Sequence, residues 1–360
     1  MQTYFNGLVY NNMDLNLHIG LPKTGTTTIQ EHFLAGASSY LGIHSQGKCL
    51  VSDKKALKGF RDIATRHRFL DRDEVLNGVD KWVQLVTSLA ENKGPFPSLC
   101  LSMEGMSRWY LYDQSEARWP VHETGAKIQG FERVRPLPAA EFIGSYLLPA
   151  WQPWGEVRVL LILRNQADWL ASLYAELSHG IAGAGQRDFE AQVTSLINKN
   201  DPAIDWWGFI QDLRSVVGDD NVKVLLFEDI GEPCFWSELA EFMGLQGEAV
   251  EKMFAGDSPR ENVRGAGMPG TWAVSREMKF CRHWLNSSWP NHLMPGVKKF
   301  FVSGVARLEP KITSLPAKLF RRGRTIEVTP ELSNLVRSHC SESNEALGLW
   351  LNRDLQALGY

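Results

Sequence analysis

The sequence has few cysteines, no long apolar run and no strong excess of charge of one sign. Its 360 residues contain five widely scattered cysteines, and none of them forms a Cys-x-x-Cys pair. This pattern does not indicate a zinc site or a redox motif, so we expect a reducing, cytosolic location. No stretch is long enough to span a bilayer, and the amino terminus lacks the basic and then apolar pattern of a secretion signal.

The charge balance excludes any global attraction to nucleic acid or to a membrane surface. The formal net charge is -3, with 44% hydrophobic and 22% charged residues, which is ordinary for a soluble globular protein. Any anion must therefore be bound by a local cluster of residues. We expect a single domain over residues 1–360, with a core at about 15–245, an irregular excursion at about 118–153 and a basic, helical carboxyl-terminal extension at about 260–360.

Short, nearly continuous apolar runs predict the strands of a buried parallel sheet. Helical patterns follow most of these runs along the chain, and such alternation indicates a three-layer α/β/α fold with helices on both faces of the sheet. The ligands of such folds lie beyond the carboxyl ends of the strands. The predicted strands are residues 15–21, 98–103, 157–163 and 222–227, and the predicted helices are residues 26–34, 166–178 and 233–244.

Two regions outside this pattern have their own composition. The excursion at 118–153 is rich in proline and tryptophan, and tryptophans in or near it are candidates for sugar stacking: Trp109, Trp119, Trp151 and Trp154. Residues 296–324 hold eight Lys or Arg against one acid. The tail predicts two helices, one starting at Thr329-Pro330 and a second within residues 341–360.

The stretch LHIGLPKTGTTTIQEHF, residues 17–33, predicts an anion-binding loop between the first strand and its helix. Gly20 and Gly25 have the spacing of a P-loop, but Thr26-Thr27 stands where that motif has Lys-Ser/Thr, and the only lysine, Lys23, lies inside the loop. A strand, a glycine turn and a helix start present backbone N–H groups and the positive end of a helix dipole to one point. Threonine hydroxyls add further donors.

The displaced lysine bears on the choice of nucleotide. In an ATP or GTP P-loop the lysine reaches the β- and γ-phosphates and the adjoining Ser/Thr holds magnesium. Lys23 would instead reach an anion from the turn itself. A P-loop kinase or NTPase that uses Mg-ATP stays an alternative, and so does a non-catalytic nucleotide- or glycan-binding protein of the same fold.

Several segments together carry a family resemblance. PKTGTTTIQ resembles the 5′-phosphosulfate loop of sulfotransferases that use 3′-phosphoadenosine 5′-phosphosulfate, and VLLILRNQADWLASLYAEL resembles the segment with which that family holds the 3′-phosphate. The segments IDWWGFI, NVKVLLFEDI and LAEFMGL are similar to the family's third portion, so the resemblance covers roughly residues 15–245.

The resemblance implies a site and a reaction. It implies that the 3′-phosphate is held by Arg164 and Ser172, and that the acceptor is a hydroxyl, which we expect on a carbohydrate or glycolipid. No metal is expected, because a sulfuryl group carries less negative charge than a phosphoryl group and depends less on magnesium. The 5′-phosphosulfate site would consist of Pro22, Lys23, Thr24, Gly25, Thr26, Thr27 and Thr28.

A hydroxyl acceptor needs a base that takes its proton during attack on sulfur. Glu104 follows the second predicted strand, on the same rim as the loop, and similar glutamates serve as the base in several carbohydrate sulfotransferases. His122 and His179 are alternative bases, whereas His18 lies within a strand and is expected in the core. The basic segment at 298–324, which contains RRGR at 321–324, either completes the 3′-phosphate pocket, attracts an anionic acceptor or forms a solvated face. RENVRGAG, residues 260–267, is a second candidate, either folding over the nucleotide or forming a solvated face.

Overall fold

The fold is known from a computed structural model of the chain. The structure describes residues 4–5, 8–9, 13–34, 37, 39–41, 59–64, 67, 70–93, 96–103, 106, 139–178, 184–245, 270–274 and 325–360.

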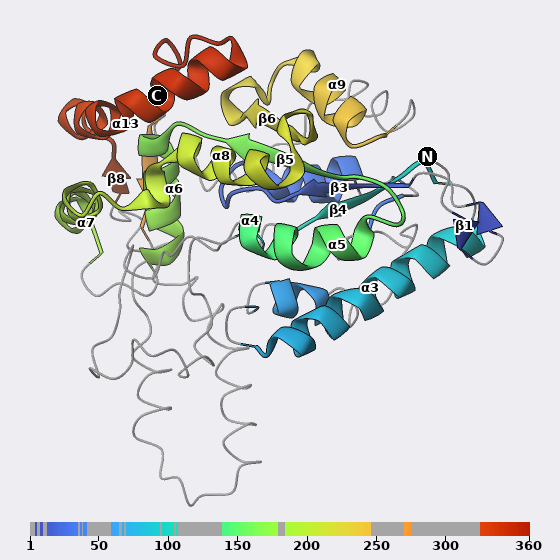
Figure 1. Ribbon diagram of the computed structural model, residues 1–360. Helices are drawn as coiled ribbons and strands as arrows, with labels where there is room; N and C mark the ends of the chain where they lie inside the picture. The colour runs from blue at the N-terminus through green and yellow to red at the C-terminus, as the bar shows by residue number, and fades with distance from the viewer. Residues whose placement is uncertain are drawn as a thin grey trace, which may run out of the picture.

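A four-stranded parallel sheet forms the centre of the molecule (Figure 1). Its strands are β3 (Asp14–His18), β4 (Ser98–Ser102), β5 (Val157–Leu163) and β6 (Val222–Leu226), in the spatial order β4-β3-β5-β6. The register aligns Leu15 with Leu99 on one side and with Val157 on the other. All four predicted strands are therefore present, and the first ends earlier than expected because residues 19–25 leave the sheet to form the loop.

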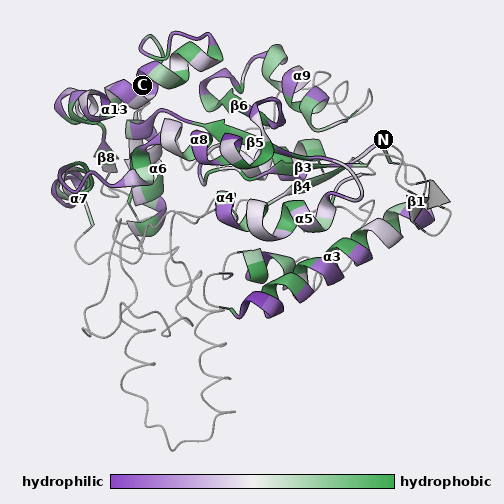
Figure 2. Cartoon of the chain, viewed as in Figure 1, coloured by the Kyte–Doolittle hydropathy of each residue, from purple (hydrophilic) through white to green (hydrophobic). Residues whose placement is uncertain are grey.

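The two faces of the sheet are covered by separate hydrophobic clusters, which confirms the three-layer prediction. Alternate β5 residues face opposite sides: Val159 and Leu161 belong to the larger cluster, and Leu160 and Ile162 to the smaller. Figure 2 shows β5 coloured as hydrophobic along much of its length. The helices over the larger cluster are α3 (Arg72–Lys93), α4 (Ala139–Phe142), α5 (Leu148–Trp151), α6 (Gln166–Leu177), α7 (Gln186–Asn198), α8 (Trp206–Val217) and α13 (Pro330–Leu351).

The smaller cluster is covered by the helix after β3 and by α9 (Pro233–Phe242). The first of these begins as α1 (Thr26–Thr28) and continues as the π-helix η1 (Ile29–Phe33). Its buried side, with Ile29 and Phe33, packs with Trp236 of α9. The predicted helices at 26–34, 166–178 and 233–244 are thus confirmed within the usual uncertainty of helix ends.

Two sequence-based expectations were wrong. The excursion was predicted irregular as far as residue 153, but residues 139–151 form α4, the π-helix η7 (Ile143–Leu147) and α5 in succession. Their buried side chains cover the sheet, and Pro149 comes directly after the π-helical turn η7. The tail was predicted as two helices, but α13 is one continuous helix, because its buried stripe runs on through Cys340 and Asn344.

The remaining elements are short. In the described part of the chain they include two antiparallel pairs, one near the amino terminus and one that joins residues 271–273 to residues 325–327. No helix of the described ranges is long and apolar enough to cross a membrane. The short elements are β1 (Tyr4–Phe5), β2 (Leu8–Val9), β7 (Thr271–Ala273), β8 (Thr325–Glu327) and the 3-10 turns η9 (Pro202–Ile204), η10 (Asp219–Asn221) and η11 (Phe227–Asp229).

Candidate active site

The strand order places the predicted loop and Arg164 side by side. From β3 the chain crosses to β4 on one side, whereas β5 leads to β6 on the other, so the connections diverge between β3 and β5. Ligands of open α/β sheets bind at such a switch point, beyond the carboxyl ends of the strands. The loop follows β3 and Arg164 follows β5, so both lie at this position.

The loop has a constrained backbone. Lys23 has φ 68° and Gly25 has φ 78°, so both lie in the left-handed region, which is uncommon for a lysine. The φ of Gly25 strains any other residue, and a Cβ there would stand 2.7 Å from Ile230 Cδ1, so that side chain would have to move. A non-glycine residue in this region costs about 1–3 kcal/mol and is typical of a functional site.

The loop threonines divide into two groups. Thr24 and Thr26 are buried, and their hydroxyls donate to the carbonyl of Leu21 at 2.6 and 3.3 Å. Thr27 and Thr28 are half-buried, and their hydroxyls form no hydrogen bond with the described residues. The first pair shapes the loop, whereas the hydroxyls of the second pair are the ones available to a ligand.

Lys23 contacts the element that follows β5 at two points. Its Nζ lies 3.0 Å from Oε2 of Glu176, and its carbonyl accepts a hydrogen bond of 3.5 Å from Nη1 of Arg164. Glu176 stands one helical turn after Ser172 on α6, so the two share a face of the helix. The sequence prediction did not include Glu176, although its spacing from Ser172 was a usable signal.

Arg164 is largely buried at the end of β5. Its guanidinium carbon lies 4.8 Å from the ring centroid of Phe227, and Nη2 is 3.8 Å from Oδ2 of Asp168. Burial lowers the pKa of Arg164 below its ordinary value, and the negative charges of Asp168 and Glu228 oppose that effect. A guanidinium stays charged in proteins, so the site holds a buried cation one strand away from the loop.

Helix α6 fixes the other side of the loop. The indole N–H of Trp169 donates to the carbonyl of Pro22 at 2.8 Å. Ser172, half-buried, lies one turn further along α6 and forms no hydrogen bond with the described residues. Pro22 therefore links the loop to α6 through its carbonyl. Lys23 lies in the loop after β3, whereas Arg164 and Ser172 lie at the end of β5 and on α6.

His18 lies beneath the loop, where it was expected as a core residue. It is fully buried, and its Nδ1 forms a hydrogen bond of 2.8 Å with Oγ of Ser102. Gln30 Nε2 donates to the same Oγ at 2.9 Å. Burial lowers the pKa of His18 to about 4, so the ring is neutral near pH 7. A Cβ on Gly20 would stand 2.6 Å from Nε2 of His18, so the ring and the loop are closely packed.

Several predicted residues lie outside the described ranges. They include the proposed base Glu104 and its alternatives, His122 and His179. Met103, the residue before Glu104, donates its backbone N–H to the carbonyl of His18 at 2.8 Å, so β4 ends beside the start of the loop. The other predictions outside the described part are Trp109, Trp119 and the basic segments at 260–267 and 298–324.

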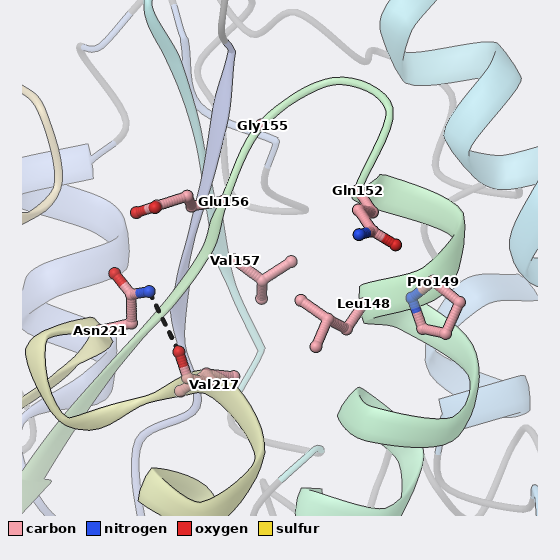
Figure 3. A pocket seen from close by; sticks show the side chains of 8 residues that line it. All are labelled: Leu148, Pro149, Gln152, Gly155, Glu156, Val157, Val217 and Asn221. Carbon is pink, nitrogen blue, oxygen red and sulfur yellow. Dashed lines mark hydrogen bonds between the residues drawn. The ribbon is translucent and has the colours of Figure 1, made fainter. Parts of the chain in front are cut away.

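A pocket of about 260 Å³ opens at the other end of the sheet (Figure 3). It lies at the amino end of β5, between Gln152, Glu156, Val157 and Asn221, on the rim opposite the loop. This position is not the one that ligands of the fold occupy, so we assign it no role. The expectation that Trp151 stacks on a sugar is wrong, because Trp151 is fully buried and its indole donates to the carbonyl of Met13.

The match to a protein-family model agrees with the resemblance seen in the sequence. The sulfotransferase domain family matches residues 16–308. Among solved structures, the chain is similar to a sulfotransferase from Alicyclobacillus acidocaldarius, with 17% identity, 83% of this chain and 95% of that chain covered, and a TM-score of 0.38. It is also similar to a sulfotransferase domain from the curacin biosynthetic pathway, with 12% identity, 82% and 97% covered, and a TM-score of 0.33.

No curated protein sequence matches the chain significantly. In the described part of the chain, no group of three or more His, Cys, Asp or Glu side chains is arranged to hold a metal ion. The family match includes the loop, β5 with Arg164, and α6 with Ser172. The chain belongs to the sulfotransferase domain family and is a transferase.

Proposed function

We propose that the chain transfers a sulfuryl group from 3′-phosphoadenosine 5′-phosphosulfate to a hydroxyl of a carbohydrate or glycolipid. The observation that carries this proposal is the contact between Arg164 and the carbonyl of Lys23. It joins a buried guanidinium at the end of β5 to an ammonium-bearing loop at the end of β3. Two cationic groups at one switch point suit a nucleotide that is anionic at both its 3′ and 5′ positions.

The residues present fit such a donor. When bound, it would supply a sulfuryl group on a phosphate leaving group. Lys23 and the backbone N–H groups from Gly25 to Thr28 would hold the 5′ end, with the hydroxyls of Thr27 and Thr28. Arg164 and Ser172 would hold the 3′-phosphate.

Lys23 has the chemical role in this proposal. Its ammonium, released from Glu176, would neutralise the charge that develops on the bridging oxygen as the bond from sulfur to that oxygen breaks. The new bond would form from sulfur to the acceptor oxygen, and Glu104 would take the acceptor proton. Because the loop has no Lys-Ser/Thr pair for a bridging magnesium, we propose that donor binding needs no metal.

Free thiols support the proposed cytosolic location. Cys100, Cys234 and Cys340 are free, and Cys100 and Cys340 are buried. Burial raises the pKa of both buried thiols to about 12, so they stay protonated and unreactive. Cys234 is free and exposed, and an exposed thiol persists most readily in a reducing compartment.

Calorimetric titration of the full chain tests the donor. We expect adenosine 3′,5′-bisphosphate to bind in a buffer without divalent metal, and Mg-ATP to bind weakly or not at all. Tight binding of Mg-ATP alone would point instead to an NTPase, and binding of neither nucleotide would contradict the proposal. Transfer of radiolabelled sulfate to a panel of glycans and glycolipids identifies the acceptor. A Glu104→Gln variant that keeps the full transfer rate would remove Glu104 from the proposal.

A further inference from the structure

The carboxyl-terminal segment, residues 330–360, lies outside the matched residues 16–308 but contacts the candidate site. It consists of α13 and the turns that follow it. Figure 1 shows α13 in red beside α6 and α8, and α13 contacts both helices. Its turns also form hydrogen bonds with residues that follow β5 and β6.

A part-buried hydrogen-bonded bridge connects Tyr360 to the residue after Arg164. The Tyr360 hydroxyl donates to Oε2 of Glu228 at 2.9 Å, and Oε1 of Glu228 accepts the backbone N–H of Asn165 at 2.8 Å. Tyr360 is only 2% exposed. Glu228 thus uses both oxygens to join this segment to the start of α6.

Asn165 and Gln166 make further contacts with the same segment. The Asn165 side chain caps α6 by accepting the N–H groups of Ala167 and Asp168, and its amide group donates to the carbonyl of Gly359. The side chains of Gln166 and Asn344 form a reciprocal amide pair at 2.7 and 3.3 Å. Both residues after Arg164 are therefore fixed by residues of the carboxyl-terminal segment.

A second link holds the 3-10 turn η11, which carries Phe227 and Glu228. Arg353 binds Asp229 with two hydrogen bonds of 2.9 and 3.1 Å. Phe227 is the ring on which Arg164 lies, and Glu228 supplies a negative charge near the guanidinium. Burial raises the pKa of Tyr360 well above its ordinary value, so the phenol stays neutral and remains a donor to Glu228.

We propose that the carboxyl-terminal segment is part of the nucleotide site, with Tyr360 and Glu228 as positioning residues that hold Arg164 against the 3′-phosphate. This inference rests on the proposed function, because it assigns the 3′-phosphate to Arg164. It goes beyond that function because it explains what sets the selectivity for a nucleotide with a 3′-phosphate. In this proposal the segment acts through Arg164, by way of its hydrogen bonds to Glu228 and Asn165.

Affinities for two nucleotides test the inference in the full chain. Adenosine 3′,5′-bisphosphate and adenosine 5′-phosphate differ only in the 3′-phosphate, the group that we assign to Arg164. We expect Tyr360→Phe to weaken binding of the bisphosphate about 2- to 10-fold, because an Arg164 that is held less firmly must be ordered when the 3′-phosphate binds, and to leave adenosine 5′-phosphate unchanged. Leu349→Ala is the matched control on α13, because Leu349 is 78% exposed, and it should change neither affinity.

The outcomes separate the two proposals. If the unmodified chain does not prefer the bisphosphate, the proposed function fails. If it does, and Tyr360→Phe keeps that preference or weakens both nucleotides equally, the positioning role is wrong. Thermal unfolding verifies that the variant is folded. If it is not, Asn344→Ser, which removes the amide pair with Gln166, is subject to the same comparison and the same outcomes.

Discussion

Around Lys23 the side-chain contacts within the described residues are few, whereas around Arg164 they are several and are joined to part-buried hydrogen bonds. The side chains of Lys23 and Glu176 are 27% and 33% exposed, and this ion pair is the contact of the Lys23 ammonium within the described residues. Arg164 is held by Phe227, Asp168 and the bridge from Glu228 to Asn165. A partly exposed ion pair is worth about 0–1 kcal/mol, whereas loss of one partner in a buried network costs about 1–3 kcal/mol.

The difference matches two separate tasks. A lysine that acts on the leaving group must exchange its partner when the donor arrives, so a weak pair with Glu176 suits it. An arginine that recognises a fixed phosphate gains from preorganisation, because less is lost in ordering it on binding. We therefore expect changes at Lys23 to act on the rate and changes at Arg164 to act on donor affinity.

Replacing the lysine is expected to have the largest effect. Lys23→Ala removes a preorganised cation from the leaving oxygen, which costs on the order of 3 kcal/mol, so kcat should fall about a hundredfold. Steady-state rates measure this, and the affinity for adenosine 3′,5′-bisphosphate should change much less. Lys81→Ala, at an exposed lysine of α3, is the control. Full activity in Lys23→Ala would remove the lysine from the mechanism.

Replacing the arginine is expected to have the next largest effect, on binding. Arg164→Lys keeps the charge but loses the planar fork, so the KM for the donor should rise about 10- to 100-fold while kcat changes little. Arg158→Lys is a matched control, because Arg158 lies at the amino end of β5 and stacks on Phe242 at 4.2 Å. A fall in kcat with an unchanged KM would contradict the division between the two regions.

The pH dependence of the stability of the protein tests the role of His18, which packs against the loop at Gly20. Its folded pKa is about 4, below the unfolded value of 6.5, so the unfolded chain takes up the proton first as the pH falls. The stability that His18 contributes is thus present above pH 6.5 and is lost toward pH 4. We expect it to fall by on the order of 2 kcal/mol between about pH 6.5 and pH 5. Urea unfolding measures this.

The matched variant for that test is His18→Gln, which keeps a polar side chain but cannot take up a proton. It should unfold with a flatter pH dependence than the unmodified chain over the same interval. Equal slopes for the two proteins would mean that His18 is not responsible. The result concerns the region of Lys23, because His18 packs under Gly20 at the start of the loop. The groups near Arg164 are linked instead to the carboxyl-terminal segment.

The sequence predicted the sheet well, because buried parallel strands read as apolar runs whatever surrounds them. The limits predicted for β5 match those observed, from Val157 to Leu163. The prediction of two helices in the tail was wrong where α13 passes through Asn344, which is buried although it is polar. Asn344 is buried by its pairing with Gln166, which lies 178 residues away and leaves no local signal.

Contacts between residues far apart in the sequence also limit the prediction of the site. The spacing of Lys23, Gly25 and the threonines is local, so a motif reveals it. The bridge from Tyr360 through Glu228 to Asn165 spans separations of 132 and 63 residues and depends on how three elements pack. Glu176 is intermediate, because its place four residues after Ser172 predicts its face of α6 but not its contact with Lys23.

The smallest effect is expected at Glu176, the ion-pair partner that Lys23 must leave when the donor binds. It therefore tests directly whether the contact of Lys23 is exchangeable. Glu176→Gln removes the carboxylate that holds Lys23, so the ammonium no longer has to leave a charged partner when an anion binds. We expect the affinity for adenosine 3′,5′-bisphosphate to rise about two- to fivefold at low salt and the gain to shrink at high salt, since partly exposed charges are screened. Calorimetry in both buffers measures this.

In a Lys23→Ala background the gain should largely disappear, because the carboxylate then has no lysine to hold. A gain of the same size in that background would mean that Glu176 only repels the ligand, and weaker binding in Glu176→Gln would mean that the carboxylate supports the site instead of competing with it.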